Sequence, residues 1–154
     1  MLLTRQGLGG VPVGATLGKF AEALGRSPAP MTATDRSILA DYSCVIRQLA
    51  RLRGVGLMVV GDDPAGRVRR ISIVAGSDIR TDTGIGLGSS LQAVRAAYGH
   101  GLDEPFDHFP VDGDAVLVRA DANRYLAFIG DSRDRVAELR LGFKPEVLYP
   151  EGCV

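Results

Sequence analysis

Two stretches of the chain, 74 residues apart, carry the same pattern of glycine and apolar residues. The segment GVPVGATLGKFAEALG (Gly10–Gly25) aligns without a gap with GIGLGSSLQAVRAAYG (Gly84–Gly99). A second pair of segments, Val59–Gly76 and Phe128–Gly142, aligns when the turn inside it is shortened. Internal self-similarity at this period predicts two copies of one structural unit.

The first pair of segments predicts one short helix in each copy. The hydroxyls of Thr16 and Ser90 suit the N-cap position, where they accept hydrogen bonds from free helix N–H groups. Gly25 and Gly99 suit the position after the last turn, which often takes a left-handed conformation. Apolar residues recur at helical spacing in between: Leu17, Phe20, Ala21 and Leu24 in the first copy, and Leu91, Val94 and Tyr98 in the second. Such short helices are marginal alone and need a surface to pack on.

That surface is predicted to be an antiparallel sheet. Short apolar, β-branched runs with brief turns between them indicate strands, namely Val55–Gly61, Val68–Val74, Ala115–Arg119, Tyr125–Ile129 and Val136–Leu141. Val68 and Val136 interrupt the alternation of apolar residues at matching places, which predicts a β-bulge in each copy.

The segment from Asp35 to Arg53 fits two structures. Ile38, Tyr42, Val45, Leu49 and Leu52 have helical spacing, with Asp35 as a cap and Gly54 as a stop. Its counterpart in the second copy, Ala115–Arg119, is predicted to be a strand. The symmetry of the copies favours a strand over Cys44–Leu52, with loops at Ser27–Thr34 and Leu102–Gly113.

The expected fold is therefore α+β, a tandem duplication of a helix plus antiparallel β-meander unit, forming one compact domain over residues 1–154. The repeats cover about 7–76 and 80–147, and 148–154 form a C-terminal tail. Residues 1–76 carry ten basic and five acidic side chains, whereas 77–154 carry eight and thirteen, so the halves should attract. The net charge is zero, and no apolar run reaches 18 residues. Neither nucleic acid binding nor a transmembrane segment is expected.

The two cysteines, Cys44 and Cys153, have no metal-binding or CxxC spacing. They are either separate thiols of a cytosolic protein or one bridge formed in an oxidising compartment. The first residues, MLLTRQGLGGVPVG, lack the apolar region of a signal peptide. The sequence fits a cytosolic protein or the mature form of an exported one.

Arginine supplies sixteen of the eighteen basic residues. On the predicted strand Arg47, Arg51 and Arg53 share one face, and Arg69 lies in another strand of the same copy. Such a strip is ordinarily solvated surface. As a binding surface it suits an acidic protein or an anionic envelope polymer, because guanidinium binds carboxylate and phosphate in a bidentate manner. No stacking aromatic residues are interleaved with these arginines, which again disfavours nucleic acid.

The residues that could carry chemistry are few. His100, Asp103, Asp107 and His108 are weak candidates for a divalent metal, but the Gly- and Pro-rich context predicts a solvated acidic loop instead. Phosphate-loop and nucleophile-elbow patterns fail on spacing. We therefore expect no catalytic residues, no cofactor, no metal site and no enzymatic activity.

Several blocks resemble a family of uncharacterised bacterial envelope proteins, periplasmic or lipid-anchored, that end in Glu-Gly-Cys. These blocks are RTDTGIGLGSSLQAVRAAYG, GRVRRISI, Cys44 before the apolar GVGLM run, and the ending EVLYPEGC. The helix-entry pattern is also similar to β-lactamase inhibitory protein and to the small lipoprotein of the outer-membrane barrel-assembly machine. This chain differs from the family in lacking a signal peptide or a lipobox cysteine.

The resemblance implies a tandem αβ-repeat fold, a Cys44–Cys153 bridge and a periplasmic or secreted location. With no catalytic constellation, the expected function is a non-enzymatic envelope binding or interaction module of unknown ligand. The alternatives are an inhibitor of a secreted hydrolase and a metal-binding protein that uses the His100–His108 loop.

Overall fold

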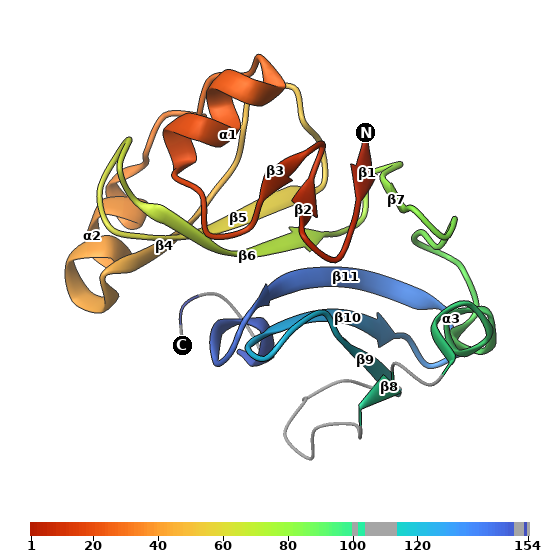
Figure 1. Ribbon diagram of the computed structural model, residues 1–154. Coiled ribbons are helices and arrows are strands. Elements are labelled where there is room, and N and C mark those ends of the chain that lie inside the picture. The colour runs from red at the N-terminus through yellow and green to blue at the C-terminus, as the bar shows by residue number, and fades with distance from the viewer. Residues whose placement is uncertain (100–101, 104–113, 150–152, 154) are drawn as a thin grey trace.

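The largest element of the computed structural model is a seven-stranded antiparallel sheet (Figure 1). The structure describes residues 1–99, 102–103, 114–149 and 153. Across the sheet the strands are β4 (Cys44–Arg47), β5 (Val55–Val60), β6 (Arg67–Ile73), β11 (Val136–Phe143), β10 (Arg124–Gly130), β9 (Ala115–Arg119) and β8 (Leu102–Asp103). The last long strands of the two halves, β6 and β11, pair at the centre, with Ile73 opposite Leu139. One sheet therefore runs through both halves.

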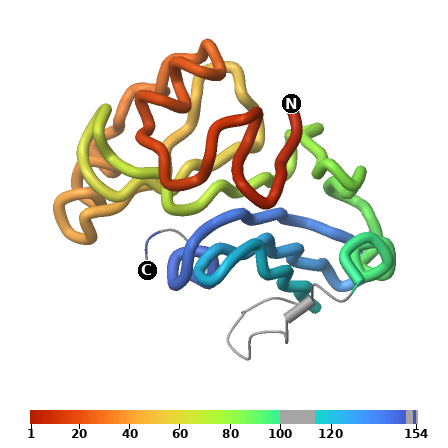
Figure 2. Tube along the Cα trace, viewed as in Figure 1, coloured from red at the N-terminus to blue at the C-terminus, as the bar shows by residue number. Residues whose placement is uncertain are grey.

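A smaller sheet joins the N-terminus to the start of the second half. Its strands, in spatial order, are β3 (Val11–Pro12), β2 (Gly7–Leu8), β1 (Leu2–Leu3) and β7 (Arg80–Thr81). β1 pairs with β7 in parallel, so that Leu3 lies opposite Thr81. Figure 2 shows the N-terminal trace beside the segment near residue 80. The first residues of the chain thus contact the second half.

The two predicted amphipathic helices are confirmed with their N-caps, whereas of the two predicted left-handed ends only Gly25 adopts that conformation, and Gly99 has a φ of 49° and a ψ of −123°. α1 (Leu17–Leu24) begins after Thr16, whose hydroxyl accepts from Lys19 N at 3.1 Å, and ends at the left-handed Gly25. α3 (Leu91–Tyr98) begins after Ser90, whose hydroxyl accepts from Ala93 N at 3.0 Å. Leu17, Phe20, Leu91, Val94 and Tyr98 are buried, as the apolar spacing predicts.

One core fills the space between these helices and the large sheet. It includes side chains from both halves, among them Phe20, Ile71, Val94, Phe128 and Leu139, each fully buried. The rings of Tyr98 and Phe128 lie 5.3 Å apart. The α+β class and the compact arrangement are confirmed, because the halves share this core and this sheet.

The two halves enter their helices through matching backbone hydrogen bonds. Gly14 N donates to Val68 O at 2.7 Å and Val68 N to Ala15 O at 2.9 Å. In the second half Gly88 N donates to Val136 O and Val136 N to Ser89 O, both at 2.8 Å. Leu17 N and Leu91 N each donate at 2.9 Å to the turn before the last long strand of their half. The bonds from Leu17 and Leu91 use N–H groups that the first helical turn leaves unpaired.

Both predicted β-bulges are present. In the first half the register passes from Met58 opposite Arg70 to Val59 opposite Val68, leaving Arg69 unpaired. In the second half it passes from Ile129 opposite Glu138 to Gly130 opposite Val136, leaving Ala137 unpaired. The irregularity occupies the same place in each half.

The ambiguous segment divides into a helix and a shorter strand. α2 (Ala33–Tyr42) is capped by Thr32, and the Asp35 carboxylate accepts from Thr32 N at 2.9 Å, so Asp35 completes a capping box and is not itself the cap. The predicted loop Ser27–Thr34 therefore ends earlier, at Thr32. β4 begins at Cys44 as predicted, but the expectation that the strand continues to Leu52 is wrong. The chain turns instead at 48–51, where Ala50 N bonds to Ser27 O at 2.8 Å and Arg51 has a φ of 61°.

Candidate functional site

The C-terminal segment crosses the face of the large sheet opposite α1 and α3. After β11 the chain forms a 3-10 helix, η2 (Glu146–Leu148). Val147 packs against Leu117, Tyr125 and Ala127, whose neighbours along the strands point to the main core. Cys153 then forms a disulfide with Cys44 at the start of β4, with the Cα atoms 5.8 Å apart. The bridge implied by the sequence resemblance is confirmed, and it ties the end of the chain to the first half.

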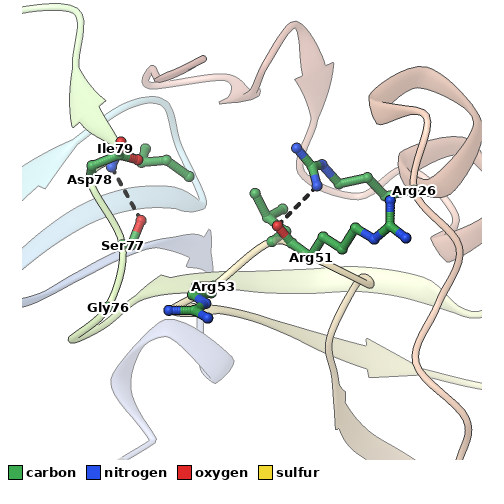
Figure 3. A pocket seen from close by; sticks show the side chains of 8 residues that line it. Arg26, Arg51, Arg53, Gly76, Ser77, Asp78 and Ile79 are labelled. Atoms are coloured by element: carbon green, nitrogen blue, oxygen red, sulfur yellow. Dashed lines mark hydrogen bonds between the residues drawn. The ribbon is translucent and has the colours of Figure 1, made fainter.

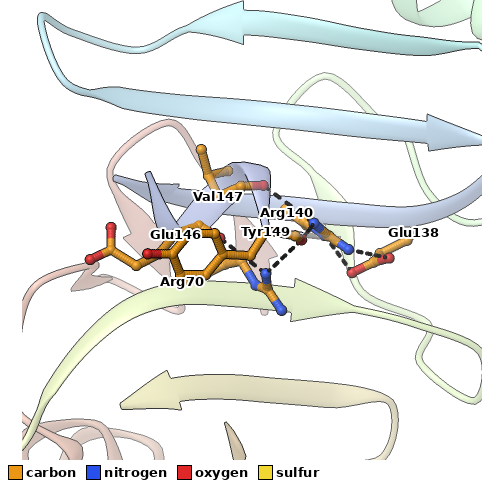
Figure 4. Close-up of polar contacts among 6 residues, drawn as sticks. All are labelled: Arg70, Glu138, Arg140, Glu146, Val147 and Tyr149. Carbon is orange, nitrogen blue, oxygen red and sulfur yellow. Dashed lines mark hydrogen bonds and ion pairs between the residues drawn. The ribbon is translucent and has the colours of Figure 1, made fainter. Parts of the chain in front are cut away.

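Buried arginines hold this segment through its backbone carbonyls (Figure 4). Arg70 donates to Glu146 O at 3.0 Å and to Tyr149 O at 3.3 Å. Arg140 donates to Val147 O at 3.3 Å and also to Tyr149 O. Each of the two arginine residues is only 4% exposed. Hydrogen bonds from charged donors are stronger than neutral ones, so these contacts anchor the tail against the sheet.

Beneath the C-terminal segment, arginine side chains outnumber the carboxylates that pair with them. Arg140 forms a bidentate pair with Glu138 at 2.7 and 3.2 Å, and Arg69 pairs with Glu146 at 3.0 Å. Burial, with the nearby Arg140 charge, lowers the pKa of Arg70 to about 10. Guanidinium groups in this position serve the fold and are closed to an external partner.

The predicted arginine strip is wrong in its geometry. β4 ends at Arg47, so Arg47, Arg51 and Arg53 do not share a strand face. Arg47 is 4% exposed, donates to Ala29 O at 3.0 Å and forms an ion pair with Asp63. Arg69 is the bulge residue, and its guanidinium is paired with Glu146. Arg47 and Arg69 are therefore engaged within the molecule. Of the four arginines predicted to form a binding surface, Arg51 and Arg53 remain as candidates.

Arg51 and Arg53 line an open hollow of about 620 Å³ together with Arg26 (Figure 3). Leu52, Gly76, Ser77, Asp78 and Ile79 complete its lining. A second hollow of about 480 Å³ is lined by Leu24, Gly25, Arg26, Ser27, Ala50 and Arg51. The two hollows share Arg26 and Arg51, so they adjoin. We call the two together the arginine trough.

Two turns at the same end of the sheet build the trough. The turn after β4 carries Arg51 and Arg53, and Arg26 Nη1 donates to Arg51 O at 2.9 Å and fixes its shape. The turn after β6 is joined to it by Val74 N, which donates to Gly54 O at 2.8 Å. Gly54 has a φ of 68°, and a Cβ there would lie 2.5 Å from Val74 O, so the close approach of the two turns requires glycine.

The trough has an excess of positive charge. Its lining holds three guanidinium groups and one carboxylate, that of Asp78. Within the described part of the chain, no carboxylate lies within ion-pairing distance of Arg26, Arg51 or Arg53. Arg51, Arg53 and Asp78 are exposed, and Arg26 is half-buried. This arrangement can bind carboxylate or phosphate groups from solution.

Sequence reasoning missed Arg26 and the turn at Gly76–Ile79. Arg26 directly follows Gly25, the predicted end of the first helix, and Gly76 follows a predicted strand. Each position lies at the end of a predicted element. Their proximity depends on how those elements pack, and nothing in the local pattern specifies that.

The candidate metal ligands are not placed. His100, Asp107 and His108 lie outside the described residues, and of Asp103 only the backbone is described, in β8. Among the residues that are described, no group of three or more His, Cys, Asp or Glu side chains could hold a metal ion. In the same part of the chain, no helix is long and apolar enough to cross a membrane.

No protein-family model, curated protein or solved structure matches this chain. The resemblance to the envelope family, to β-lactamase inhibitory protein and to the assembly lipoprotein therefore stays a prediction. Descent of the two halves from one duplicated unit, the hydrolase-inhibitor alternative and the metal-binding alternative also stay predictions.

Proposed function

We propose that this protein is a non-enzymatic binding module of the bacterial cell envelope that docks an anionic partner in the arginine trough. One observation carries the proposal. Arg26, Arg51 and Arg53 converge on one open trough, and no described carboxylate pairs with them. Three other arginines of the first half, Arg47, Arg69 and Arg70, already have partners within the fold.

The trough is organised before any ligand arrives. Arg26 holds the backbone of Arg51, and the two turns are joined through Gly54 and Val74. A site whose turns are already ordered loses little conformational entropy on binding. This favours recognition over a purely structural role for the exposed guanidinium groups.

A periplasmic or secreted location is part of the proposal. The Cys44–Cys153 disulfide is compatible with an oxidising compartment, where such bonds persist. The same bond attaches Cys153 to the first half at Cys44, the first residue of β4.

The test removes two trough charges and compares the result with removal of two charges elsewhere. The variant is R51Q/R53Q, which keeps Arg26 because its guanidinium also holds the backbone. The matched control is R36Q/R133Q, which removes two exposed arginines outside the trough. The probe is fluorescein-labelled poly-L-glutamate, followed by fluorescence polarisation at low salt.

We expect R51Q/R53Q to bind the probe about tenfold more weakly, since two surface charges together contribute about 1.4 kcal/mol. The control should differ from the parent by less than about twofold. Equal binding by all three proteins, or no binding by any, would overturn the proposal.

A further inference from the structure

The apolar part of the trough narrows the chemistry of its partner. We propose that the arginine trough takes an extended acidic peptide segment of a partner protein, in which apolar side chains are interspersed among carboxylates. The inference rests on the proposed function above. It adds that the ligand is a peptide and that its apolar side chains contribute to binding.

The length of the trough favours an extended ligand. Its two hollows, of about 480 and 620 Å³, adjoin at Arg26 and Arg51. Arg53 lies in the larger hollow only, so the guanidinium groups are distributed along the trough. A single small anion would engage one end, whereas an extended chain with several acidic groups engages both.

The lining of the trough favours a ligand that is partly apolar. Leu24 and Leu52 contribute to the lining and are packed, partly buried, against the main core. Ile79, at the far side of the larger hollow, is only 6% exposed, so the accessible large apolar side chains of the lining are Leu24 and Leu52. A purely ionic polymer gains nothing from this surface. A leucine or valine side chain lying on it removes apolar area from water, at about 25 cal/mol per Å².

Two further features favour a peptide over a phosphate polymer. No aromatic side chain lines either hollow in the described part of the chain, so bases have no stacking platform there. The exposed carboxylate of Asp78 repels negative charge placed beside it, which disfavours a polymer with a charge on every unit and is tolerated by a peptide that can place an uncharged residue there. The same carboxylate can accept hydrogen bonds from the N–H groups of a peptide backbone.

The experiment compares two labelled peptides of equal length and charge on the full, oxidised protein. One peptide is four repeats of Asp-Asp-Leu and the other is four repeats of Asp-Asp-Ser. We expect the leucine peptide to bind about tenfold more tightly, which corresponds to about 1.4 kcal/mol. R51Q/R53Q should weaken the binding of both peptides by a similar factor, because the two peptides carry the same charge.

A second measurement locates the site without any substitution in the apolar lining. Titration of ¹⁵N-labelled protein with the leucine peptide should shift the amide resonances of residues 51–54 and 76–79. A third measurement substitutes the apolar lining itself. Leu52→Ser should reduce the preference for the leucine peptide over the serine peptide, provided that the circular dichroism of the variant matches that of the parent.

The outcomes separate this inference from the proposed function. Equal affinity for the two peptides, or tighter binding of inorganic polyphosphate than of the leucine peptide, overturns the acidic-apolar peptide and leaves an anion-binding trough. Shifts confined to another surface overturn the site itself. Failure of every anionic probe overturns the inference and the proposed function together.

Discussion

The two halves of the molecule share a backbone arrangement and differ in what their side chains do with it. Each half enters its helix through the same pair of bonds to a strand valine, Val68 or Val136. Each carries a bulge one residue further along that strand. The bulge residue is Arg69 in the first half and Ala137 in the second. Arg69 pairs with Glu146 of η2, whereas Ala137 is exposed.

The difference shows which parts of the arrangement are constrained. Buried N–H and C=O groups must find partners, so the helix entry is satisfied in the same manner in both halves. A bulge residue is left out of the ladder, so its side chain is free to differ. The first half uses this freedom to pair Arg69 with Glu146, and its turn around 48–54 carries Arg51 and Arg53 of the trough.

The largest expected effect on stability comes from removing the disulfide that links the C-terminal segment to the first half. Replacing both cysteines (C44S/C153S) should lower the free energy of unfolding by about 4–5 kcal/mol, because the bond closes a loop with a sequence separation of 109 residues. Denaturant unfolding measures the loss. A reducing agent should destabilise the parent by a similar amount and leave the double variant unchanged. An unaltered midpoint in the double variant would contradict a stabilising role.

The next largest effect tests whether α1 and α3 contribute equally to the stability of the core. Leu17 and Leu91 hold the same place in α1 and α3 and are 0% and 1% exposed. Leu17→Ala and Leu91→Ala should each cost about 3 kcal/mol, since both leave a cavity in the shared core. Chemical denaturation of the two variants should agree to within about 1 kcal/mol. A much larger difference would show that only one half supports the core.

A smaller effect on stability is expected when the two bulges are given the same residue type. Arg69→Ala gives the first half the residue type that the second half has at Ala137. We expect a loss of about 1 kcal/mol, because the Arg69–Glu146 pair is only partly buried. Arg133→Ala, which removes an exposed arginine, is the control and should cost less than about 0.5 kcal/mol. A double-mutant cycle with Glu146→Gln isolates the pair, and a coupling of zero would count against it.

The smallest effect concerns α2, which belongs to the first half and contains no buried residue. Hydrogen bonds from the Thr32 backbone, and then from its side chain, lower the pKa of Asp35 below 3.8. A lowered pKa in the folded state means that the ionised carboxylate stabilises α2 above pH 3.8, and that this contribution fades as the pH falls through the folded pKa.

Asp35→Asn should therefore destabilise α2 near neutral pH, by less than about 1 kcal/mol, and have no effect at strongly acidic pH. Amide hydrogen exchange of residues 33–42 measures this locally. Ser37→Ala, an exposed position on the same helix, serves as the control. A difference between parent and variant that does not change with pH would exclude the carboxylate as its source.

Local chemistry accounts for what could be predicted from the sequence. The caps at Thr16 and Ser90, the alternating strands and the interruptions at Val68 and Val136 are each specified within a few residues. Thr32 and Asp35 are both good capping residues, and the capping box uses both. Taking Asp35 as the N-cap therefore places the predicted start of the helix about one turn after the observed start of α2.

The site was less predictable because burial depends on remote segments. Arg70 is closed off only because η2 and the tail lie over it, more than 70 positions further along the chain. Arg26 and Arg53 line one hollow because the segment after α1 is hydrogen-bonded to the turn after β4. The sequence pattern identified an arginine-rich region, and tertiary contacts divided it into structural and exposed members.

The bond between Cys44 and Cys153 has a mechanical consequence. It makes a covalent ring that contains every strand of the large sheet, and it leaves residues 1–43 and Val154 outside. Tension applied between the two termini passes through the sulfur atoms and bypasses the sheet. Only the first 43 residues can be drawn out, to a length of about 15 nm, whereas the reduced chain extends to more than about 50 nm. Pulling on the two ends of the oxidised molecule therefore extends only the N-terminal segment, residues 1–43, and leaves the ring closed by the disulfide intact.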